Sequence, residues 1–202
     1  MVFSATYPSS LGPIVIESDG ETLTGLRFGE EKLALQSGDS NIGIVPHPMP
    51  TQATSSLPIF DEVTRWLDDY FSGKRTENAT MGKQLENVTI GKQTENATIG
   101  VKADARIVVK PKGTMFQRRI WQALLTIPYG ETVSYGAIAR MVGCKSAQAV
   151  GQAVGANPIA LLIPCHRVIA ANGKLGGYAY GEERKKRLLA WEQQGKHKTF
   201  FC

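Results

Sequence analysis

A cysteine followed directly by a histidine and an arginine, at 165–167, is the part of the sequence whose residue types suggest chemistry. A thiolate is the nucleophilic form of cysteine, and positive charge on His166 or Arg167 would favour it. Glu192 falls on the apolar side of a predicted helix, where a carboxylate needs a partner, and it could orient His166 as a base. Because a lone cysteine usually only packs in a core, the hypothesis that Cys165 is a nucleophile depends on these neighbours.

The spacing of these residues limits the mechanism. The cysteine follows a proline, so we expect an extended loop in which Cys165 and His166 point in opposite directions. A bridging water would then connect them, in the order Glu192, His166, water, Cys165. This disfavours a papain-like protease, in which the histidine contacts the sulfur and comes from a distant part of the chain. It also disfavours a metal site, because further ligands are lacking; we expect neither a metal nor a cofactor.

Three short helices are predicted ahead of the cysteine, each with a recognisable start. A capping box at 114–117 begins an apolar helical face that continues to Ile127. Ser134 and Ser146 can each cap a further helix, and the short connection at 143–145 between those two helices suggests a helix-turn-helix.

The third of these helices has a face with almost no side chains. Ala147, Gly151 and Gly155 recur there at intervals of four residues. A glycine inside a helix costs up to about 1 kcal/mol relative to alanine, so something should require a close approach. Tight packing on another helix is one interpretation and entry into a narrow groove of DNA is the other; the residues alone slightly favour packing.

The N-terminal part of the chain predicts a small α/β unit. Strand-like segments at 12–17 and 25–28 flank the turn signal Asp19-Gly20, and an apolar helical face runs over 60–71 and stops before Gly73.

A different pattern follows, because residues 77–103 are three tandem copies of a nine-residue unit. Each copy has too little apolar surface to offset the entropy of ordering, so we expect a mobile loop, with a stack of β-turns as the alternative. These patterns divide the chain into an N-terminal domain at 1–76, a repeat-containing linker at 77–110 and a C-terminal domain at 111–202.

Charge and cysteine content narrow the class of protein. The chain has 202 residues and a formal net charge of +5, but residues 111–202 hold 13 Lys and Arg against 4 Asp and Glu. The C-terminal part is therefore the candidate for binding a polyanion such as DNA. Three cysteines without a CxxC pair favour a reducing compartment. The start lacks the pattern of a signal peptide and no run of 18 apolar residues occurs, so we expect a cytoplasmic protein that contacts no membrane.

Several separated motifs together resemble one known family, the methylated-DNA–protein-cysteine methyltransferases. The motifs are IPYGETVSYGAIA at 127–139, Asn157-Pro158, IPCHRVI at 163–169, Gly177-Tyr-Ala179 and ERKKRLLAWE at 183–192. They agree with the family in order and spacing over about residues 113–193. The likeness is loose over 1–75 and absent over the repeats.

The resemblance implies a fold and a set of roles. The fold would be α+β, with a small N-terminal α/β domain containing an RNase-H-like sheet, followed by a mainly helical, winged helix-turn-helix-like domain. The activity would be a single, irreversible transfer of an alkyl group from O6-alkylguanine, and also from O4-alkylthymine, in double-stranded DNA to Cys165 of a monomeric protein. Extrusion of the damaged base from the duplex would precede the transfer.

Residue roles carry over position by position. In the reaction itself, Asn157 would brace the cysteine loop and Tyr135 would protonate the departing guanine, beside Cys165, His166 and Glu192. The resemblance reverses our preference for packing on the third helix, which becomes the DNA-reading helix. The residues implied in binding DNA or the alkylated base are Ala147, Gln148, Ala149, Gly151, Arg167, Val168, Tyr178 and Ala179.

Two positions depart from the family pattern. Gln148 stands where many relatives have an arginine that inserts into the base stack, and Tyr180 stands where a glycine is common. These departures concern base extrusion and pocket shape rather than the reaction. Three other interpretations stay open on the residues alone: a sensor that binds alkylated DNA without chemistry, a regulator for which alkylation is the signal, and a thiol protease. The sensors of this kind lack the cysteine, which this chain has.

Overall fold

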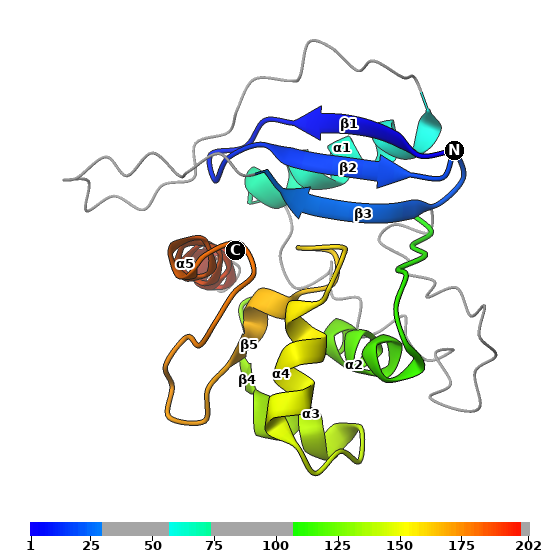
Figure 1. Ribbon diagram of the computed structural model, residues 1–202. Coiled ribbons are helices and arrows are strands. Elements are labelled where there is room, and N and C mark those ends of the chain that lie inside the picture. The colour runs from blue at the N-terminus through cyan, green and yellow to red at the C-terminus, as the bar shows by residue number, and fades with distance from the viewer. Residues whose placement is uncertain (30–56, 74–106, 199–202) are drawn as a thin grey trace.

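The computed structural model describes residues 1–29, 57–73 and 107–198, so the predictions for the repeats at 77–103 fall outside the described residues. An N-terminal sheet and one helix lie against a larger helical part (Figure 1). In chain order the elements are β1 (Phe3–Tyr7), β2 (Ile14–Ser18), β3 (Leu23–Phe28), α1 (Pro58–Phe71), α2 (Met115–Leu125), β4 (Val133–Ser134), α3 (Tyr135–Met141), α4 (Ala147–Gly155), the 3-10 turn η4 (Cys165–Arg167), β5 (Val168–Ile169) and α5 (Glu182–Lys198).

The N-terminal sheet is antiparallel in the order β1-β2-β3, and α1 packs against one of its faces (Figure 1). The predicted hairpin between β2 and β3 is confirmed. The carboxylate of Asp19 accepts the amide of Thr22 at 2.8 Å, and Gly20 has a φ of +109°, which L side chains rarely adopt. The helix predicted over 60–71 is confirmed with its end at Phe71. β1 was not predicted.

The three predicted helix starts of the C-terminal part are confirmed. Both halves of the Thr114–Gln117 capping box are present at α2. The side chains of Ser134 and Ser146 accept amides of the first turns of α3 and α4, each at 3.1 Å. Gly143, with a φ of +66°, makes the turn between α3 and α4, which pack together as a helix-turn-helix.

Two segments from the C-terminal part join the sheet at β3. The amide of Leu23 donates to the carbonyl of Val108 at 2.9 Å, and the amide of Leu26 donates to the carbonyl of Pro158 at 2.9 Å. Residues 107–110, which we predicted as part of a linker, lie against β3, where Ile107 and Val109 are buried. Apolar residues of both halves form one continuous core.

The segment that carries the cysteine is also not the extended loop we expected. Cys165, His166 and Arg167 form η4, because the amide of Arg167 turns back to the carbonyl of Pro164 at 3.1 Å. β5 follows and pairs in parallel with β4, which fixes the exit of η4 beside the start of α3. In the part of the chain that is described, none of the helices is both long and apolar enough to span a bilayer.

Candidate active site

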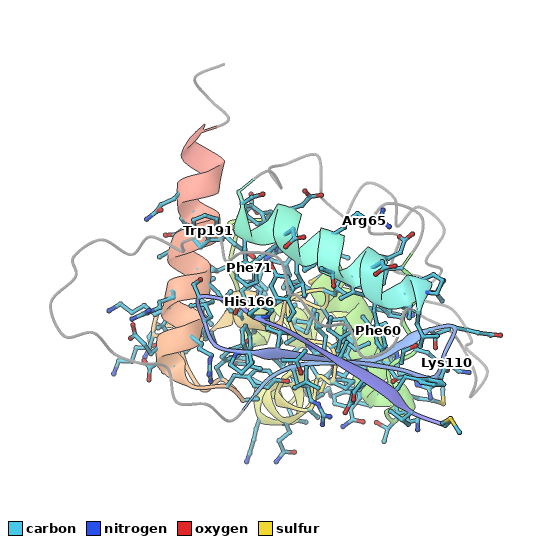
Figure 2. All side chains as sticks on the ribbon, turned by 90° about the horizontal axis from the view of Figure 1, so that it is seen from above. Phe60, Arg65, Phe71, Lys110, His166 and Trp191 are labelled. Carbon is cyan, nitrogen blue, oxygen red and sulfur yellow. The ribbon has the colours of Figure 1, made fainter. Side chains whose placement is uncertain are left out.

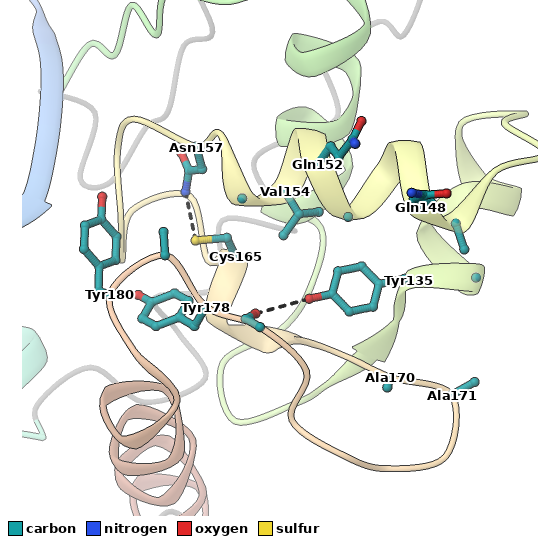
Figure 3. A pocket seen from close by; sticks show the side chains of 16 residues that line it. Tyr135, Gln148, Gln152, Val154, Asn157, Cys165, Ala170, Ala171, Tyr178 and Tyr180 are labelled. Atoms are coloured by element: carbon teal, nitrogen blue, oxygen red, sulfur yellow. Dashed lines mark hydrogen bonds between the residues drawn. The ribbon is translucent and has the colours of Figure 1, made fainter.

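A pocket of about 830 Å³ opens between α4 and the loop at 170–180, with Cys165 in its wall (Figure 3). Cys165 is 5% exposed and lies in the lining of this pocket. Eight of the residues that we predicted for the site line it: Tyr135, Ala147, Gln148, Gly151, Asn157, Cys165, Tyr178 and Ala179. Five others lie off the pocket wall, namely Ala149, His166, Arg167, Val168 and Glu192.

Glu192 is the centre of a buried polar cluster behind the cysteine. Its carboxylate is within 2.8 Å of Nε2 of His166 and accepts Nε of Arg167 at 2.8 Å. It also accepts the amide of Gly130 at 3.1 Å and the hydroxyl of Tyr70 at 2.8 Å. Burial would raise the pKa of Glu192, but the positive charge of Arg167 and the contacts with His166 outweigh burial and hold the pKa well below its usual range. The partner that we expected for this carboxylate is therefore a set of four residues.

His166 is fully buried and adjoins the thiol in sequence. Burial lowers the pKa of His166, and the nearby carboxylate of Glu192 only partly opposes this, so the imidazole is neutral at pH 7. Because Nε2 faces a carboxylate, we assign the proton to Nε2, which leaves Nδ1 as a proton acceptor. Nδ1 has no hydrogen-bond partner among the described residues. His166 thus has the tautomer and the free nitrogen that a base requires.

The guanidinium of Arg167, a residue that we predicted for binding DNA or the alkylated base, is engaged with buried groups. Besides its contacts with Glu192, its Nη1 donates to the carbonyl of Ile127 at 2.7 Å. The guanidinium also lies over the ring of Tyr129, 5.5 Å from its centroid. Its donors are directed into the core because Glu192 is a charge that only a buried cation can neutralise there.

The thiol of Cys165 accepts a hydrogen bond from Nδ2 of Asn157 at 3.2 Å (Figure 3). The same Nδ2 donates to the carbonyl of Ile163 at 2.8 Å, and Oδ1 accepts the amide of Ile159 at 3.0 Å. Asn157 therefore ties both ends of the segment that leads to the cysteine. This segment is held against β3, where the amide of Ala160 donates to the carbonyl of Leu26 at 2.7 Å.

Burial raises the pKa of Cys165, although the hydrogen bond from Asn157 and the charge of Lys185 oppose the increase. The positive charge that favours the thiolate therefore comes from Lys185, and not from His166 or Arg167 as we expected. Arg167 is engaged with Glu192 and His166 is neutral, so neither supplies charge to the sulfur. The resting group is a thiol, and a base must remove its proton when it reacts.

Tyr135 begins α3, and its ring lines the pocket beside Gly151 of α4. Its hydroxyl donates to the carbonyl of Gly177 at 3.4 Å (Figure 3). Burial raises the pKa of Tyr135, so the hydroxyl keeps its proton at neutral pH. A Cβ at Gly151 would lie 3.8 Å from this ring, an ordinary contact, and one at Gly155 would meet nothing within 4 Å. Packing between helices therefore does not require these glycines, and the bare face of α4 is open.

Lys185 is a site residue that our sequence analysis missed. It is fully buried, and Nζ donates to the carbonyls of Val168 at 2.7 Å and Leu175 at 2.5 Å. Val168, which we expected to contact DNA or the alkylated base, is itself fully buried, and its carbonyl accepts this hydrogen bond from Lys185. Lys185 precedes Glu192 by seven residues and therefore lies on the same buried face of α5. This signal was available in the sequence.

The two residues that depart from the family pattern occupy different ends of the pocket. Gln148 is exposed in the first turn of α4. Tyr180 is half-buried, and its ring packs edge-on against Phe28 of β3 at 5.5 Å and against Tyr178 at 5.4 Å between centroids. Tyr180 therefore connects the pocket wall to the N-terminal sheet.

Fold and site together define a helix-turn-helix protein with a thiol in a pocket beside the second helix of that motif. Two family models match the chain: "6-O-methylguanine DNA methyltransferase, ribonuclease-like domain" over residues 2–80, and "6-O-methylguanine DNA methyltransferase, DNA binding domain" over residues 115–194. The chain therefore belongs to the methylated-DNA–protein-cysteine methyltransferase family, as its motifs indicated.

Individual relatives agree over nearly the whole chain. The methylated-DNA–protein-cysteine methyltransferase of Mycobacterium tuberculosis is 38% identical over 194 residues, which cover 96% of this chain and 93% of that protein. The Haemophilus influenzae protein of the same name is 35% identical over 188 residues, covering 93% and 84%. A crystal structure of Mycobacterium tuberculosis OGT in complex with DNA has a TM-score of 0.65 and 36% identity, and the match covers 95% of this chain and 92% of that one.

Proposed function

We propose that this protein repairs DNA by transferring the alkyl group of O6-alkylguanine, and also of O4-alkylthymine, to its own Cys165. The observation that carries the proposal is the thiol in the pocket wall below α4, with the buried pair of His166 and Glu192 behind it. The protein would act in the cytoplasm, where a reducing environment keeps the thiol free.

The pocket accounts for how a base would reach the sulfur. An alkylated base inside a duplex is out of reach, so it must rotate out of the stack, which costs a few kcal/mol. The open face of α4 would lie in the minor groove, and the base would enter between Tyr135 and the loop that carries Tyr178 and Ala179. The basic C-terminal part would supply the contacts with phosphates.

The reaction is a displacement at carbon. Sγ of Cys165 attacks the alkyl carbon, and the bond from that carbon to O6 breaks with its electron pair going to guanine. The thiol proton passes through a water to Nδ1 of His166, while Glu192 stabilises the imidazolium. The hydroxyl of Tyr135 protonates the guanine and becomes a phenolate. The imidazolium of His166 then releases its proton to water, and the phenolate takes up a proton from water, so that both residues return to their starting states. The product is a thioether, which thiol exchange cannot reverse, so one molecule repairs one lesion.

Incubation with duplex DNA that carries a labelled O6-methylguanine tests the proposal. Mass spectrometry should find one added methyl group per chain, on Cys165. Cys165→Ser should abolish transfer and leave DNA affinity nearly unchanged, because phosphate contacts dominate affinity. Binding without transfer would instead identify a sensor, and a methyl group on Cys144 or Cys202 would contradict the assignment of the acceptor.

A further inference from the structure

One of the groups that hold Glu192 comes from the other half of the molecule. Tyr70 lies in the last turn of α1, and its hydroxyl donates to Oε1 of Glu192 at 2.8 Å, across 122 residues of sequence. Oε1 is also the oxygen that faces Nε2 of His166, at 2.8 Å. The N-terminal part of the chain thus reaches the carboxylate on the side where it orients the imidazole.

A second hydrogen bond joins Tyr70 to α5, the helix that carries Glu192. The indole Nε1 of Trp191 donates to the main-chain carbonyl of Tyr70 at 3.0 Å. Figure 2 shows Trp191 of α5 beside the C-terminal end of α1. Two consecutive residues of α5, Trp191 and Glu192, are therefore bound to one residue of α1.

Aromatic side chains surround the ring of Tyr70 and hold its hydroxyl toward Glu192. The residue is 1% exposed, and its ring contacts those of Trp66, Phe71 and Tyr129 at centroid distances of 5.4, 5.2 and 6.1 Å. Burial, together with the negative charge of Glu192, raises the pKa of Tyr70 well above its usual value, so the hydroxyl keeps its proton at neutral pH and can donate it to the carboxylate.

The remaining donors to Glu192 come from the C-terminal part of the chain. They are the amide of Gly130 and the side chains of His166 and Arg167. Arg167 neutralises the carboxylate, but it donates to both of its oxygens. It therefore does not determine which of the two oxygens faces His166. The hydroxyl of Tyr70 adds a fixed donor on Oε1 alone, which restricts where His166 can bind.

We propose that Tyr70 is a positioning residue for alkyl transfer, through which the N-terminal domain holds Glu192 in the orientation that His166 requires. The proposal rests on the function proposed above. It gives the N-terminal domain a part in the reaction in addition to its part in folding. Tyr70 touches neither the thiol nor the pocket, so its effect on transfer must pass through Glu192.

Tyr70→Phe removes only the hydroxyl and keeps the ring in place. At saturating DNA we expect the transfer rate constant to fall roughly tenfold, in the range that follows the loss of one hydrogen bond to a charged group. DNA affinity should not change. Tyr7→Phe is the matched control, because it removes another buried tyrosine hydroxyl bonded to a carboxylate, that of Asp68 on the same helix, at 2.8 Å. It should lower stability and leave the transfer rate at the wild-type value.

A double-mutant cycle separates positioning from general destabilisation. In a Glu192→Gln background, Tyr70→Phe should cause little further loss of rate, because two residues that act through one interaction are not additive. His166→Gln provides a second background if Glu192→Gln does not fold. An equal loss in the variant backgrounds and in the wild type would overturn the proposal, as would a wild-type rate for Tyr70→Phe.

The same double-mutant cycle can be measured without DNA, from the rate at which iodoacetamide alkylates Cys165. Mass spectrometry of the peptide that contains Cys165 follows this reaction. Tyr70→Phe should slow this alkylation at pH 7, and the loss should again disappear when Glu192 is replaced. If the wild type failed to accept a methyl group from DNA, the proposed function would be wrong, while the alkylation cycle would still support or overturn the role of Tyr70.

Discussion

At the scale of single residues, Glu192 is a buried charge that contributes both to the stability of the fold and to the proposed reaction. Its pKa in the folded protein is held below the value of about 4.3 that it has when unfolded. The unfolded state therefore binds more protons than the folded state in acid, so this residue stabilises the fold above about pH 4 and its contribution is lost as the pH falls through the lower folded pKa.

Glu192→Gln should consequently weaken both stability and transfer. With Arg167 left as an uncompensated buried charge, we expect a loss of about 3 kcal/mol in the free energy of unfolding at pH 7. Stability should also fall less steeply than in the wild type as the pH is lowered below 4. Transfer should slow at least tenfold, because a base contributes a hundredfold or more. Urea denaturation from pH 2 to 7 and single-turnover assays measure these effects. An unchanged rate would make Glu192 a structural residue only.

Gln148 has no charge to offer to a phosphate. It is exposed on the first turn of α4, beside the pocket. Gln148→Arg should tighten binding to DNA and steepen the slope of log affinity against log salt by about 0.9, the value for one phosphate. Gln148→Ala should slow repair of duplex DNA if the amide fills the space that the extruded base leaves. Fluorescence anisotropy over a range of salt and single-turnover repair give the two results. Equal repair rates for all three proteins would exclude a role in the stack.

Tyr180 limits the size of the pocket near the sulfur. Tyr180→Gly should enlarge it and raise the transfer rate for a benzyl group relative to a methyl group, while methyl transfer stays within about threefold of the wild type. The loss of two ring contacts should also cost about 1 to 2 kcal/mol of stability. Competition between DNA duplexes that carry the two lesions measures the ratio of rates. A ratio unchanged from the wild type would show that another part of the wall sets the alkyl range.

At the scale of elements, the parts that the sequence predicted are those with local signals. Capping side chains and apolar spacing located α2, α3 and α4, since each signal lies within one helical turn of the boundary it marks. The pairing of residues 107–110 with β3 depends on contacts between distant parts of the chain. The 3-10 turn at Cys165 and the strand β1 are formed by local hydrogen bonds, but their sequences carry no capping or spacing signal that we recognised. The spacing of Lys185 from Glu192 indicated its buried face, but the partners of Lys185 and Tyr70 become evident only when α5 is placed against the cysteine segment and α1.

The bare face of α4 gives a prediction that separates stability from DNA binding. Gly151→Ala should stabilise the protein by up to about 1 kcal/mol, because alanine favours a helix and its Cβ meets only ordinary contacts. The same methyl group should weaken binding to DNA if this face enters a narrow groove. Thermal denaturation and DNA titration measure the two effects. A gain in stability with unchanged affinity would show that this part of α4 does not approach the duplex.

At the scale of the whole molecule, the two family domains share a core. β3 is hydrogen-bonded to segments at 107–110 and 158–160, and α1 is bonded to α5 through Tyr70. The two halves differ in charge, since the C-terminal part is strongly basic, yet apolar side chains of both meet without interruption. A polar interface between independent domains would allow them to move separately, whereas a continuous core couples them.

We therefore expect the two parts to unfold together. Trp66 lies in α1 and Trp121 in α2, so proteins that keep only one of these two tryptophans, with the others replaced by Phe, report separately on each part. Their urea unfolding curves, followed by fluorescence, should have midpoints that agree within error after correction for the effect of the replacements on stability, as two-state unfolding requires. Separation of the N-terminal midpoint to lower urea would mean that the hydrogen bonds at β3 and the bond from Tyr70 to Glu192 do not couple the domains. The N-terminal part could then open while Cys165 remained in a folded pocket, and Tyr70 would lose its hold on Glu192 without loss of the fold around the thiol.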